Sequence, residues 1–571
     1  MKRTDAPRGG MEIMIEGIIH INGKRYCVKA KKGTSALALF REREEAVYAP
    51  CGGNGTCGKC RMYIRGEVSV PDEKERALLG EERLNKGIRL ACMCRLLGDF
   101  EIAPTDGAMQ IQTEASCISY TQDPFLRSEK HGEETVFYRD GAEHCRAYGE
   151  VRNLGIAADI GTTTVAVYLC DMDEGQMIGK RGFENPQSVY GADVISRMDK
   201  IMKDGALLSV QQKSICGAIR KAAHDLCREH GLTAGDIRAA VICGNTVMQH
   251  IAAGIDPVSI AVAPFTAPTL FGEVYDAHRL GLLPNENAVA YFAPCFASYV
   301  GGDIACGMIA SGLDACRERV LFVDIGTNGE IGLATEKGLY FCSAAAGPAF
   351  EGAHIACGMA GIPGAIGRVF VRNGEILYET VDGAPARGIC GSGILDAVAV
   401  MLDTGLLDET GLIAEKDEAG EFSRYIDEDE DGNAVFVLDK ERNIYICAKD
   451  IREIQLAKAA VCAGVRTLLH ESGIEAESLS RVVIAGGFGS HLRAYSISRI
   501  GLLPPIDIGK YEFVGNAAGA GAVAILLGRE PRASAETVCL KSAYTELSTS
   551  AYFMEKYIDE MMFSTENGEE D

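Results

Sequence analysis

The chain has 571 residues, of which 47% are hydrophobic and 24% are charged, and this balance is ordinary for a folded globular protein of several domains. Its formal net charge of -23 argues against a nucleic-acid surface, because phosphate backbones are bound by basic stripes and the sequence contains none. No apolar run approaches the roughly 20 residues that span a bilayer, and the first ten residues lack the apolar core of a signal peptide. We therefore expect a cytoplasmic protein without membrane contact, whose partners are small molecules or other proteins.

The first predicted domain is a small β-rich fold at residues 12–103, which follows a disordered start at residues 1–11. Residues 12–30 alternate apolar and polar side chains around an Asn-Gly pair, and this pattern is typical of a β-hairpin. A charged stretch at residues 73–85 has helical character, and a last strand at residues 99–102 closes the domain.

Residues 104–150 are polar and show little periodicity, so we expect a linker there, with room for a short structured piece. Two similar α/β halves follow, the first at residues 151–318 and the second at residues 319–530. In each half two strands are joined by a short turn, and helical patterns come later in the chain. Residues 531–571 are expected to form a C-terminal tail whose acidic end is disordered. The simplest arrangement is two halves that enclose a cleft.

Five of the 21 cysteines cluster in the first domain. Cys51, Cys57 and Cys60 have the spacing C-x5-C-x2-C, and a fourth thiolate follows in the stretch RLACMC, at Cys92 or at Cys94. Four thiolates with glycines between the first three are typical of a [2Fe-2S] cluster, because the backbone can wrap closely around the sulfurs. A structural zinc site and buried free thiols are the alternatives, although zinc sites prefer paired CxxC units. We predict a [2Fe-2S] cluster held by Cys51, Cys57, Cys60 and Cys92.

This cysteine segment resembles the [2Fe-2S] ferredoxin domains of the C-x5-C-x2-C type, in which the last ligand lies in a sequence like LAC. The resemblance covers residues 12 to about 103 and supports Cys92 as the fourth ligand. In such domains the cluster transfers one electron at a time. The other cysteines are scattered singly in apolar surroundings, which indicates packing residues in a reducing compartment.

The motif DIGTTT at residues 159–164 recurs as DIGTNG at residues 324–329. A tight strand-turn-strand with glycine at the bend presents N–H groups and hydroxyls to a phosphate chain, and the aspartate at the strand end can hold Mg2+ through water. The duplication resembles the actin, sugar-kinase and heat-shock chaperone superfamily, whose two phosphate loops face each other across a nucleotide cleft. This resemblance implies catalytic roles for Asp159 and Asp324, with Mg2+, and an ATP site at Gly161, Thr162, Thr163, Thr164, Gly326, Thr327, Asn328 and Gly329.

A third glycine-rich segment, GGFG, follows the predicted strand at residues 481–485. It matches the adenosine loop of the same superfamily, where glycines let the backbone pass close to the nucleotide's sugar and base. The match assigns to this loop Gly486, Gly487, Phe488 and Gly489. Gly347, within AAAGPAFEG, and the glycines of the CGSG stretch at residues 390–393 are also candidates for the cleft, with helix packing as an equal alternative.

The order of a ferredoxin-type domain, a linker and a doubled phosphate-loop ATPase resembles the reductive activators of corrinoid proteins, which also contain a CGSGILD-like stretch and a GGFG loop. The resemblance implies an α/β protein in which a β-grasp [2Fe-2S] domain precedes a duplicated, actin-like (ribonuclease H-like) ATPase domain. It further implies an ATP-dependent enzyme that transfers one electron from its cluster to the inactive Co(II) corrinoid of a partner methyltransferase or corrinoid protein, restoring Co(I). An upstream electron donor and a homodimer are part of the same expectation.

Two other functions remain open at the level of sequence. ATP-dependent activators of 2-hydroxyacyl-CoA dehydratases also couple this ATPase fold to electron transfer, but they use a [4Fe-4S] cluster that bridges two subunits. Their cluster cysteine would fall at Ala344 here, so the match fails at that position. The second alternative is a ferredoxin module fused to a non-catalytic nucleotide sensor, and the intact loops in both halves argue against it.

Overall fold

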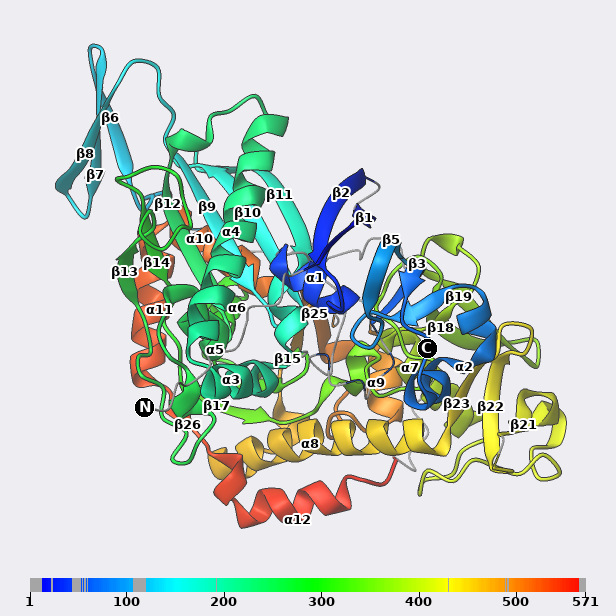
Figure 1. The fold of residues 1–571 in the computed structure, drawn as a ribbon. Helices are drawn as coiled ribbons and strands as arrows, with labels where there is room; N and C mark the ends of the chain where they lie inside the picture. The colour runs from blue at the N-terminus through cyan, green and yellow to red at the C-terminus, as the bar shows by residue number, and fades with distance from the viewer. Residues whose placement is uncertain are drawn as a thin grey trace, which may run out of the picture. The chain divides into compact units, whose positions relative to one another are not determined.

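The computed structural model describes residues 13–21, 24–43, 53, 55, 58, 60–105, 120–191, 193–429, 431–487, 489 and 492–563. Its elements are shown in Figure 1. The chain divides into two compact units, of which the first comprises Met1–Ala108 and Pro186–Arg197 and the second comprises Met109–Asn185 and Met198–Asp571. Within the described ranges, no helix is both long enough and apolar enough to cross a bilayer.

The first unit contains a five-stranded sheet in the order β2-β1-β5-β3-β4, together with helices α1 and α2, and this arrangement agrees with the predicted β-grasp domain. β1 pairs antiparallel with β2 and parallel with β5, while β3 lies antiparallel between β5 and β4. The elements are β1 (Met14–Ile21), β2 (Lys24–Lys31), α1 (Ala36–Glu42), β3 (Arg61–Val68), α2 (Glu73–Asn85), β4 (Ile88–Leu90) and β5 (Leu96–Pro104).

A buried ion pair fixes α2 of the first unit against β4. Both Arg89 and Glu75 are almost fully enclosed, and Arg89 Nη2 lies 2.8 Å from Glu75 Oε2. The same carboxylate accepts the backbone N–H of Leu90 at 2.8 Å, so none of its charge is left unpaired in the core. This contact holds the strand that leads directly into the Cys92 turn.

The second unit contains two six-stranded sheets with the same core topology, which confirms the predicted duplication. In each sheet the first strand is central: it pairs antiparallel with the second strand and parallel with a later strand. The first sheet has the order β11-β10-β9-β12-β14-β13 and the second has the order β25-β24-β15-β16-β17-β26. Most of the central strands are buried along nearly their whole length, which explains their continuous apolar sequences.

The strands of the first sheet are β9 (Leu154–Ile160), β10 (Thr164–Asp171), β11 (Gln176–Glu184), β12 (Ile237–Gly244), β13 (Glu273–Asp276) and β14 (Val289–Phe292). Those of the second sheet are β15 (Val320–Ile325), β16 (Gly329–Thr335), β17 (Gly338–Ala344), β24 (Arg481–Ala485), β25 (Tyr511–Gly515) and β26 (Ala543–Tyr544). The helices of this unit include α4 (Ala206–Glu229), α5 (Thr246–Ala253), α6 (Gly302–Ala310), α7 (Gly391–Asp403), α8 (Ala448–Ser472), α10 (Ala517–Leu527) and α11 (Arg529–Lys541).

Helices α6 and α10 connect the cores of the two sheets. Ile525 of α10 packs with β9 and β12, whereas Ile304 of α6 packs with β15 and β24. The two helices approach each other closely at Gly521, where a Cβ atom would lie 1.9 Å from the carbonyl oxygen of Cys306. Only glycine fits at such a contact, and the close approach brings the first strands of both sheets to a common region.

The structure differs from the predicted linker at residues 104–150. Three antiparallel strands, β6 (Arg127–His131), β7 (Glu134–Arg139) and β8 (Ala142–Tyr148), form a separate sheet that Figure 1 shows projecting at the upper left. Phe125 and Leu126 are buried in the core of the second unit, and Arg238 stacks on Phe137 with 4.2 Å to the ring centroid. The turn signal Asp140-Gly141, with φ of 50 and 83 degrees, was present in the sequence. The middle of the expected linker, residues 106–119, lies outside the described residues.

Most of the predicted C-terminal tail is also ordered structure. α11 is followed by β26, which extends the second sheet beside β17, and by α12 (Ala551–Asp559). Helix α12 packs along α8, and the buried Lys458 of α8 donates to the carbonyl oxygen of Met562. Helix α12 has no fully buried residue, and α11 buries only Pro531, Ala535 and Val538. Both the expected disordered start and the acidic end of the tail lie outside the described residues.

Candidate cluster and nucleotide sites

The described part of the predicted cluster site brings two cysteines together. Cys60 precedes β3 and Cys92 lies in the turn between β4 and β5, and their sulfur atoms are 3.4 Å apart. The backbone N–H of Ala91 donates to the carbonyl oxygen of Cys60 at 2.8 Å and fixes the two segments side by side. Two thiolates on one tetrahedral metal with bonds of about 2.3 Å lie roughly 3.8 Å apart, so this pair fits one iron with little movement. Cys51 and Cys57 lie outside the described residues.

Three glycines of the cysteine loop have backbone conformations that favour glycine. Gly53, Gly55 and Gly58 have φ of 86, 66 and 65 degrees, all in the left-handed region. Side chains at these positions would strain the loop, so the glycines allow the chain to curve around a buried group. The donor set and the loop conformation therefore fit a [2Fe-2S] cluster.

Cys94, the alternative fourth ligand, is fully buried in the core of the first unit. Burial raises the pKa of the Cys94 thiol to about 11, although the charge of Arg89 opposes this shift. Binding of Cys94 to iron as a thiolate would therefore cost more free energy than binding of an ordinary thiol, and the sulfur of Cys92 already lies 3.4 Å from that of Cys60. The geometry therefore favours Cys92 over Cys94.

The two DIGT motifs form tight turns between paired strands, as predicted. Asp159 lies near the end of β9 and Asp324 near the end of β15, and the glycine two residues after each aspartate opens the turn. A Cβ atom on Gly161 would lie 2.7 Å from the carbonyl oxygen of Thr164, so a side chain does not fit there. In the second turn the N–H of Gly326 donates to the carbonyl oxygen of Asn328 at 3.1 Å.

Three hydroxyl groups in the two turns have defined partners in the second unit. Asn245, which caps α5, donates to Thr162 Oγ1 at 3.0 Å. Thr163 and Thr327, one from each turn, both donate to the carboxylate of Glu351. The structure therefore brings the two predicted phosphate loops together around one residue that the sequence analysis did not identify.

Four carboxylates gather beside the two turns. Besides Asp159 and Asp324 they include Asp303, in the first turn of α6, and Glu330 of β16. Desolvation raises the pKa of Asp159 to about 6, that of Asp324 to about 7 and that of Asp303 to about 8. The charges of Asp159 and Asp324 raise the pKa of Asp303 further, and desolvation also raises that of Glu330. Such a concentration of negative charge is typical of a site that binds a cation.

The two predicted catalytic aspartates are held in different ways, Asp159 by a hydrogen bond and Asp324 by a steric contact. Asn516, which caps α10, donates to Asp159 Oδ2 at 3.0 Å. Asp324 packs against Gly486, where a Cβ atom would lie 2.4 Å from Asp324 Oδ1. Among the side chains that the structure describes, no three carboxylates, histidines or cysteines form a ready metal site.

The predicted adenosine loop starts beside the second phosphate loop. Gly486 has φ of 92 degrees and follows β24 directly, while Gly489 packs on Ile484. Gly487 is exposed, and Phe488 lies outside the described residues. Gly486 is therefore required both by its backbone conformation and by its contact with Asp324.

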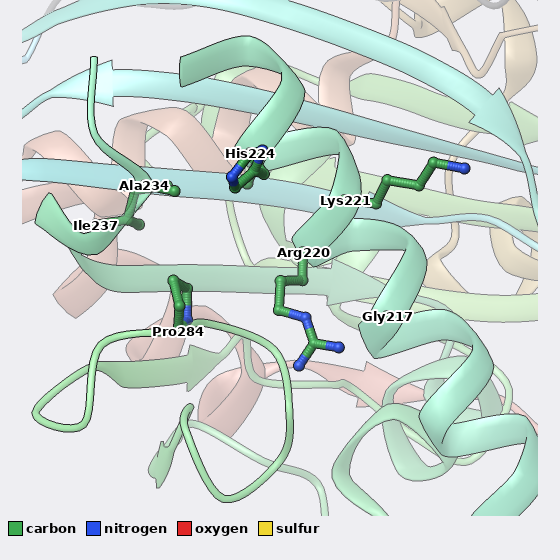
Figure 2. Close-up of a pocket in the computed structure, with 8 residues that line it drawn as sticks. Gly217, Arg220, Lys221, His224, Ala234, Ile237 and Pro284 are labelled. Carbon is green, nitrogen blue, oxygen red and sulfur yellow. The ribbon is translucent and has the colours of Figure 1, made fainter. Parts of the chain in front are cut away.

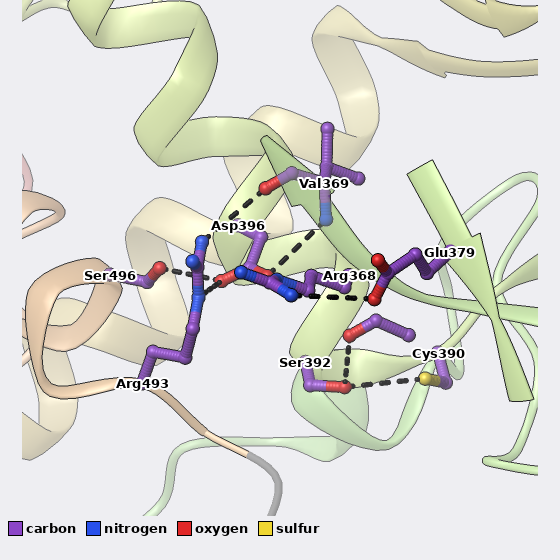
Figure 3. Close-up of polar contacts among 9 residues, drawn as sticks. Arg368, Val369, Glu379, Cys390, Ser392, Asp396, Arg493 and Ser496 are labelled. Carbon is purple, nitrogen blue, oxygen red and sulfur yellow. Dashed lines mark hydrogen bonds and ion pairs between the residues drawn. The ribbon is translucent and has the colours of Figure 1, made fainter. Parts of the chain in front are cut away.

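Figure 3 shows a polar network that fixes the chain after the adenosine loop. The buried Asp396 of α7 accepts hydrogen bonds from Ser496 Oγ at 2.6 Å and from Arg493 Nε at 3.1 Å. It also accepts the N–H of Val369 at 3.3 Å, on β18 (Ala365–Arg372). This network was not predicted, because Asp396 and Arg493 are 97 residues apart in sequence.

The remaining glycine candidates divide between two roles. Gly347 has φ of 76 degrees and begins the short helix η4 (Pro348–Glu351), so it shapes the turn that presents Glu351. Gly393, in the CGSG stretch, lies at the start of α7, and a Cβ atom there would be 2.1 Å from the carbonyl oxygen of Ile366. The packing of α7 therefore explains Gly393. Gly347 instead begins the short helix that carries Glu351, which accepts hydrogen bonds from both phosphate loops.

A separate pocket of about 260 Å³ lies against α4 and is shown in Figure 2. Arg220, His224 and Pro284 are among its lining residues. It contains none of the predicted cluster or nucleotide residues.

Three family models match consecutive parts of the chain. The 2Fe-2S iron-sulfur cluster binding domain matches residues 19–97, the RACo middle region matches residues 154–316, and the C-terminal domain of RACo, the ASKHA domain, matches residues 318–570. These matches agree with the fold seen in the two units.

Two curated relatives and one solved structure match long stretches of the chain. Corrinoid activation enzyme RamQ of Eubacterium limosum is 34% identical over 561 residues, covering 90% of this chain and 93% of that protein. The Co(II) methylated amine-specific corrinoid protein reductase of Methanosarcina barkeri is 25% identical over 390 residues, or 61% of this chain and 66% of that protein. The solved structure of a reductive activator for corrinoid, iron-sulfur protein is 31% identical, with a TM-score of 0.69 over 96% of this chain and 98% of that chain. The chain therefore belongs to the family of reductive activators of corrinoid proteins, with a 2Fe-2S domain followed by the RACo middle region and the C-terminal ASKHA domain.

Proposed function

We propose that this protein transfers one electron at a time to the Co(II) corrinoid of a partner protein, restoring Co(I), in a reaction that requires ATP. The observation that carries the proposal is the presence in one chain of a paired-cysteine loop and of two phosphate loops that converge on one carboxylate. An electron-transfer domain does not need an ATPase by itself. The names of the relatives support a corrinoid protein as the partner.

The cluster would be held by Cys51, Cys57, Cys60 and Cys92. When bound, it supplies a one-electron carrier that an upstream donor reduces and the partner's corrinoid oxidises. The chain's contribution is a loop whose glycines curve around the sulfurs and whose Cys60 and Cys92 already lie together.

The nucleotide would bind between the two phosphate loops. Backbone N–H groups and hydroxyls at residues 161–164 and 326–329 would bind the phosphates. The backbone of residues 486–489 would lie close to the adenosine. Asp159 and Asp324 would hold Mg2+ through its bound water molecules. Direct coordination is less favourable because Asp159 Oδ2 already accepts a hydrogen bond from Asn516 and Asp324 Oδ1 is packed against Gly486. A magnesium ion would also offset the repulsion among the four carboxylates.

ATP can drive electron transfer only through the complex with the partner. Its binding or hydrolysis must favour a state in which the partner's cobalt accepts the electron more readily. Linkage then requires that nucleotide change the affinity for the corrinoid protein, and that the partner change the affinity for nucleotide by the same factor. A reducing compartment such as the cytoplasm is part of the proposal, because cysteines such as Cys216, Cys227 and Cys462 are buried singly among apolar side chains. A homodimer remains part of the proposal on the basis of family resemblance.

The test measures the formation of Co(I) from a Co(II) corrinoid protein under anaerobic conditions. The cobalamin absorption spectrum is recorded during the reaction. Wild type should reduce the corrinoid only with ATP, whereas Cys57→Ser and Asp324→Ala should both fail for different reasons. Cys316→Ser and Asp427→Ala serve as matched controls, since both residues are partly exposed and lie outside the two sites, and both variants should keep the activity. Equal reduction by wild type without ATP would contradict the proposal.

A further inference from the structure

The carboxylate of Glu351 joins the two phosphate loops. Thr163 of the first loop donates to Glu351 Oε2 at 2.8 Å, and Thr327 of the second loop donates to Glu351 Oε1 at 2.6 Å. One residue therefore engages one hydroxyl from each half of the duplicated fold, and each carboxylate oxygen has its own partner.

A rigid turn presents Glu351 to the loops. It is the last residue of η4, which lies between Gly347 and Gly352, with φ of 76 and 77 degrees. Phe350 is fully buried next to it, and a Cβ atom on Gly352 would lie 2.7 Å from the backbone nitrogen of Met359. The surrounding packing therefore sets the position of Glu351, which is itself only partly buried and remains accessible from the site.

The partners of Glu351 are the groups that a phosphate chain would use. Hydroxyls of phosphate loops donate to phosphate oxygens, so a bound triphosphate would compete with Glu351 for Thr163 and Thr327. It would also bring its negative charge close to the carboxylate, and like charges at short distance repel. Nucleotide binding would therefore release both carboxylate oxygens while leaving Glu351 next to the terminal phosphate.

The other carboxylates at the site are less suited to accept a proton from water. Asn516 engages Asp159, and Asp324 is packed on Gly486, within the group of charges that would face a cation. A carboxylate that binds a cation through water is a poor base, because the cation stabilises its ionised form. Glu351 is on η4, outside these strands, and would be freed by the substrate itself.

We propose that Glu351 is the catalytic base of ATP hydrolysis in this protein, an inference that rests on the nucleotide site of the proposed function. The oxygen of a water molecule forms a bond to the terminal phosphorus, and the bond from that phosphorus to the bridging oxygen breaks. ADP leaves with the electron pair of the broken bond, and the proton of the water passes to the carboxylate of Glu351. Before that step, the same carboxylate competes with the nucleotide for the two threonine hydroxyls.

This dual role predicts opposite effects on binding and on turnover. In Glu351→Gln and Glu351→Ala, the dissociation constant for ATP with Mg2+ should be unchanged or lower, because a competing charge is removed. The kcat for hydrolysis should fall about 100-fold or more, which is the usual contribution of a general base. Glu375→Gln, an exposed glutamate of β19 (Glu375–Thr380), is the matched control and should leave both quantities unchanged.

The experiment uses the full-length protein, with calorimetric titration of a non-hydrolysable ATP analogue and a steady-state phosphate-release assay. Full hydrolysis by Glu351→Gln, with wild-type binding, would overturn the role of Glu351 and leave the nucleotide site intact. Loss of binding together with a lower thermal midpoint in both variants would show a merely structural role and would also overturn it. If wild type itself binds no nucleotide, the proposed site fails, and the inference fails with it.

Discussion

The sulfur atoms of Cys60 and Cys92 lie 3.4 Å apart, although 32 residues separate them in the chain. They meet because β3 and β4 pair antiparallel and place the start of one strand beside the turn that follows the other. This relationship makes the choice of the fourth cluster ligand testable, since Cys94 lies two residues further on in the core.

We predict that Cys92→Ser loses the cluster and that Cys94→Ser keeps it. A buried thiol whose pKa is raised to about 11 is a poor ligand, whereas Cys92 already faces another cysteine. Iron content and the visible charge-transfer absorption, measured on anaerobically purified protein, should show about two irons per chain in wild type and in Cys94→Ser. Retention of both irons in Cys92→Ser would assign the ligand to Cys94, and zinc in place of iron would contradict the cluster itself.

The boundary of the ATPase unit gives a second prediction. A chain starting at residue 109 should bind and hydrolyse ATP without the cluster domain, because the second unit begins there. A chain starting at residue 151 should be less stable by several kcal/mol, because it removes the buried Phe125 and Leu126 from the core. Denaturant unfolding of the two chains measures the difference, and equal stability would show that residues 120–150 are dispensable.

The four carboxylates at the phosphate loops predict a pH-dependent stability. An aspartate whose pKa is raised from about 3.9 in the unfolded chain stabilises the folded state only while it is protonated, so this contribution is lost as the pH rises. Desolvation raises the pKa of Asp303 to about 8, so the loss should extend from about pH 4 to pH 8. Without metal or nucleotide, the thermal midpoint of wild type should therefore fall over this range relative to that of Asp303→Asn. Parallel curves for the two proteins would refute the prediction, and added Mg2+ should reduce the difference.

The network around Asp396 predicts a variant that affects nucleotide binding from a distance. Asp396→Ala leaves Arg493 and Ser496 without their partner and frees the chain that follows the adenosine loop. We expect a loss of roughly 1–3 kcal/mol in unfolding free energy, because the hydrogen bonds to the buried carboxylate of Asp396 are lost, and weaker binding of ATP. Glu379→Ala removes an exposed partner of Arg368 on the neighbouring strand and is the control, expected to cost less than about 1 kcal/mol. Unchanged ATP affinity in a destabilised Asp396→Ala would restrict the network to a structural role.

Local patterns in the sequence predicted the repeated elements well. The strand at residues 481–485 and the helix at residues 73–85 agree with β24 and α2 at both ends, although the backbone of α2 leaves the helical conformation at Gly80. The two DIGT turns were recognisable for the same reason: a glycine at a tight bend is required locally. The cluster site was recognisable from the sequence because three of its four predicted thiols, Cys51, Cys57 and Cys60, lie within one short segment.

Contacts between distant segments decided the rest. The sequence by itself determined the duplicated halves, the cysteine loop and the positions of Asp159 and Asp324, since short-range geometry requires each of them. Only the tertiary structure brought Glu351 between Thr163 and Thr327, and it placed strands at residues 127–148 and helices after residue 528 where polar segments suggested linker and tail. These features depend on surfaces and partners contributed by other parts of the chain, and the free energy that orders them comes from burial and hydrogen bonds formed only when the whole unit folds.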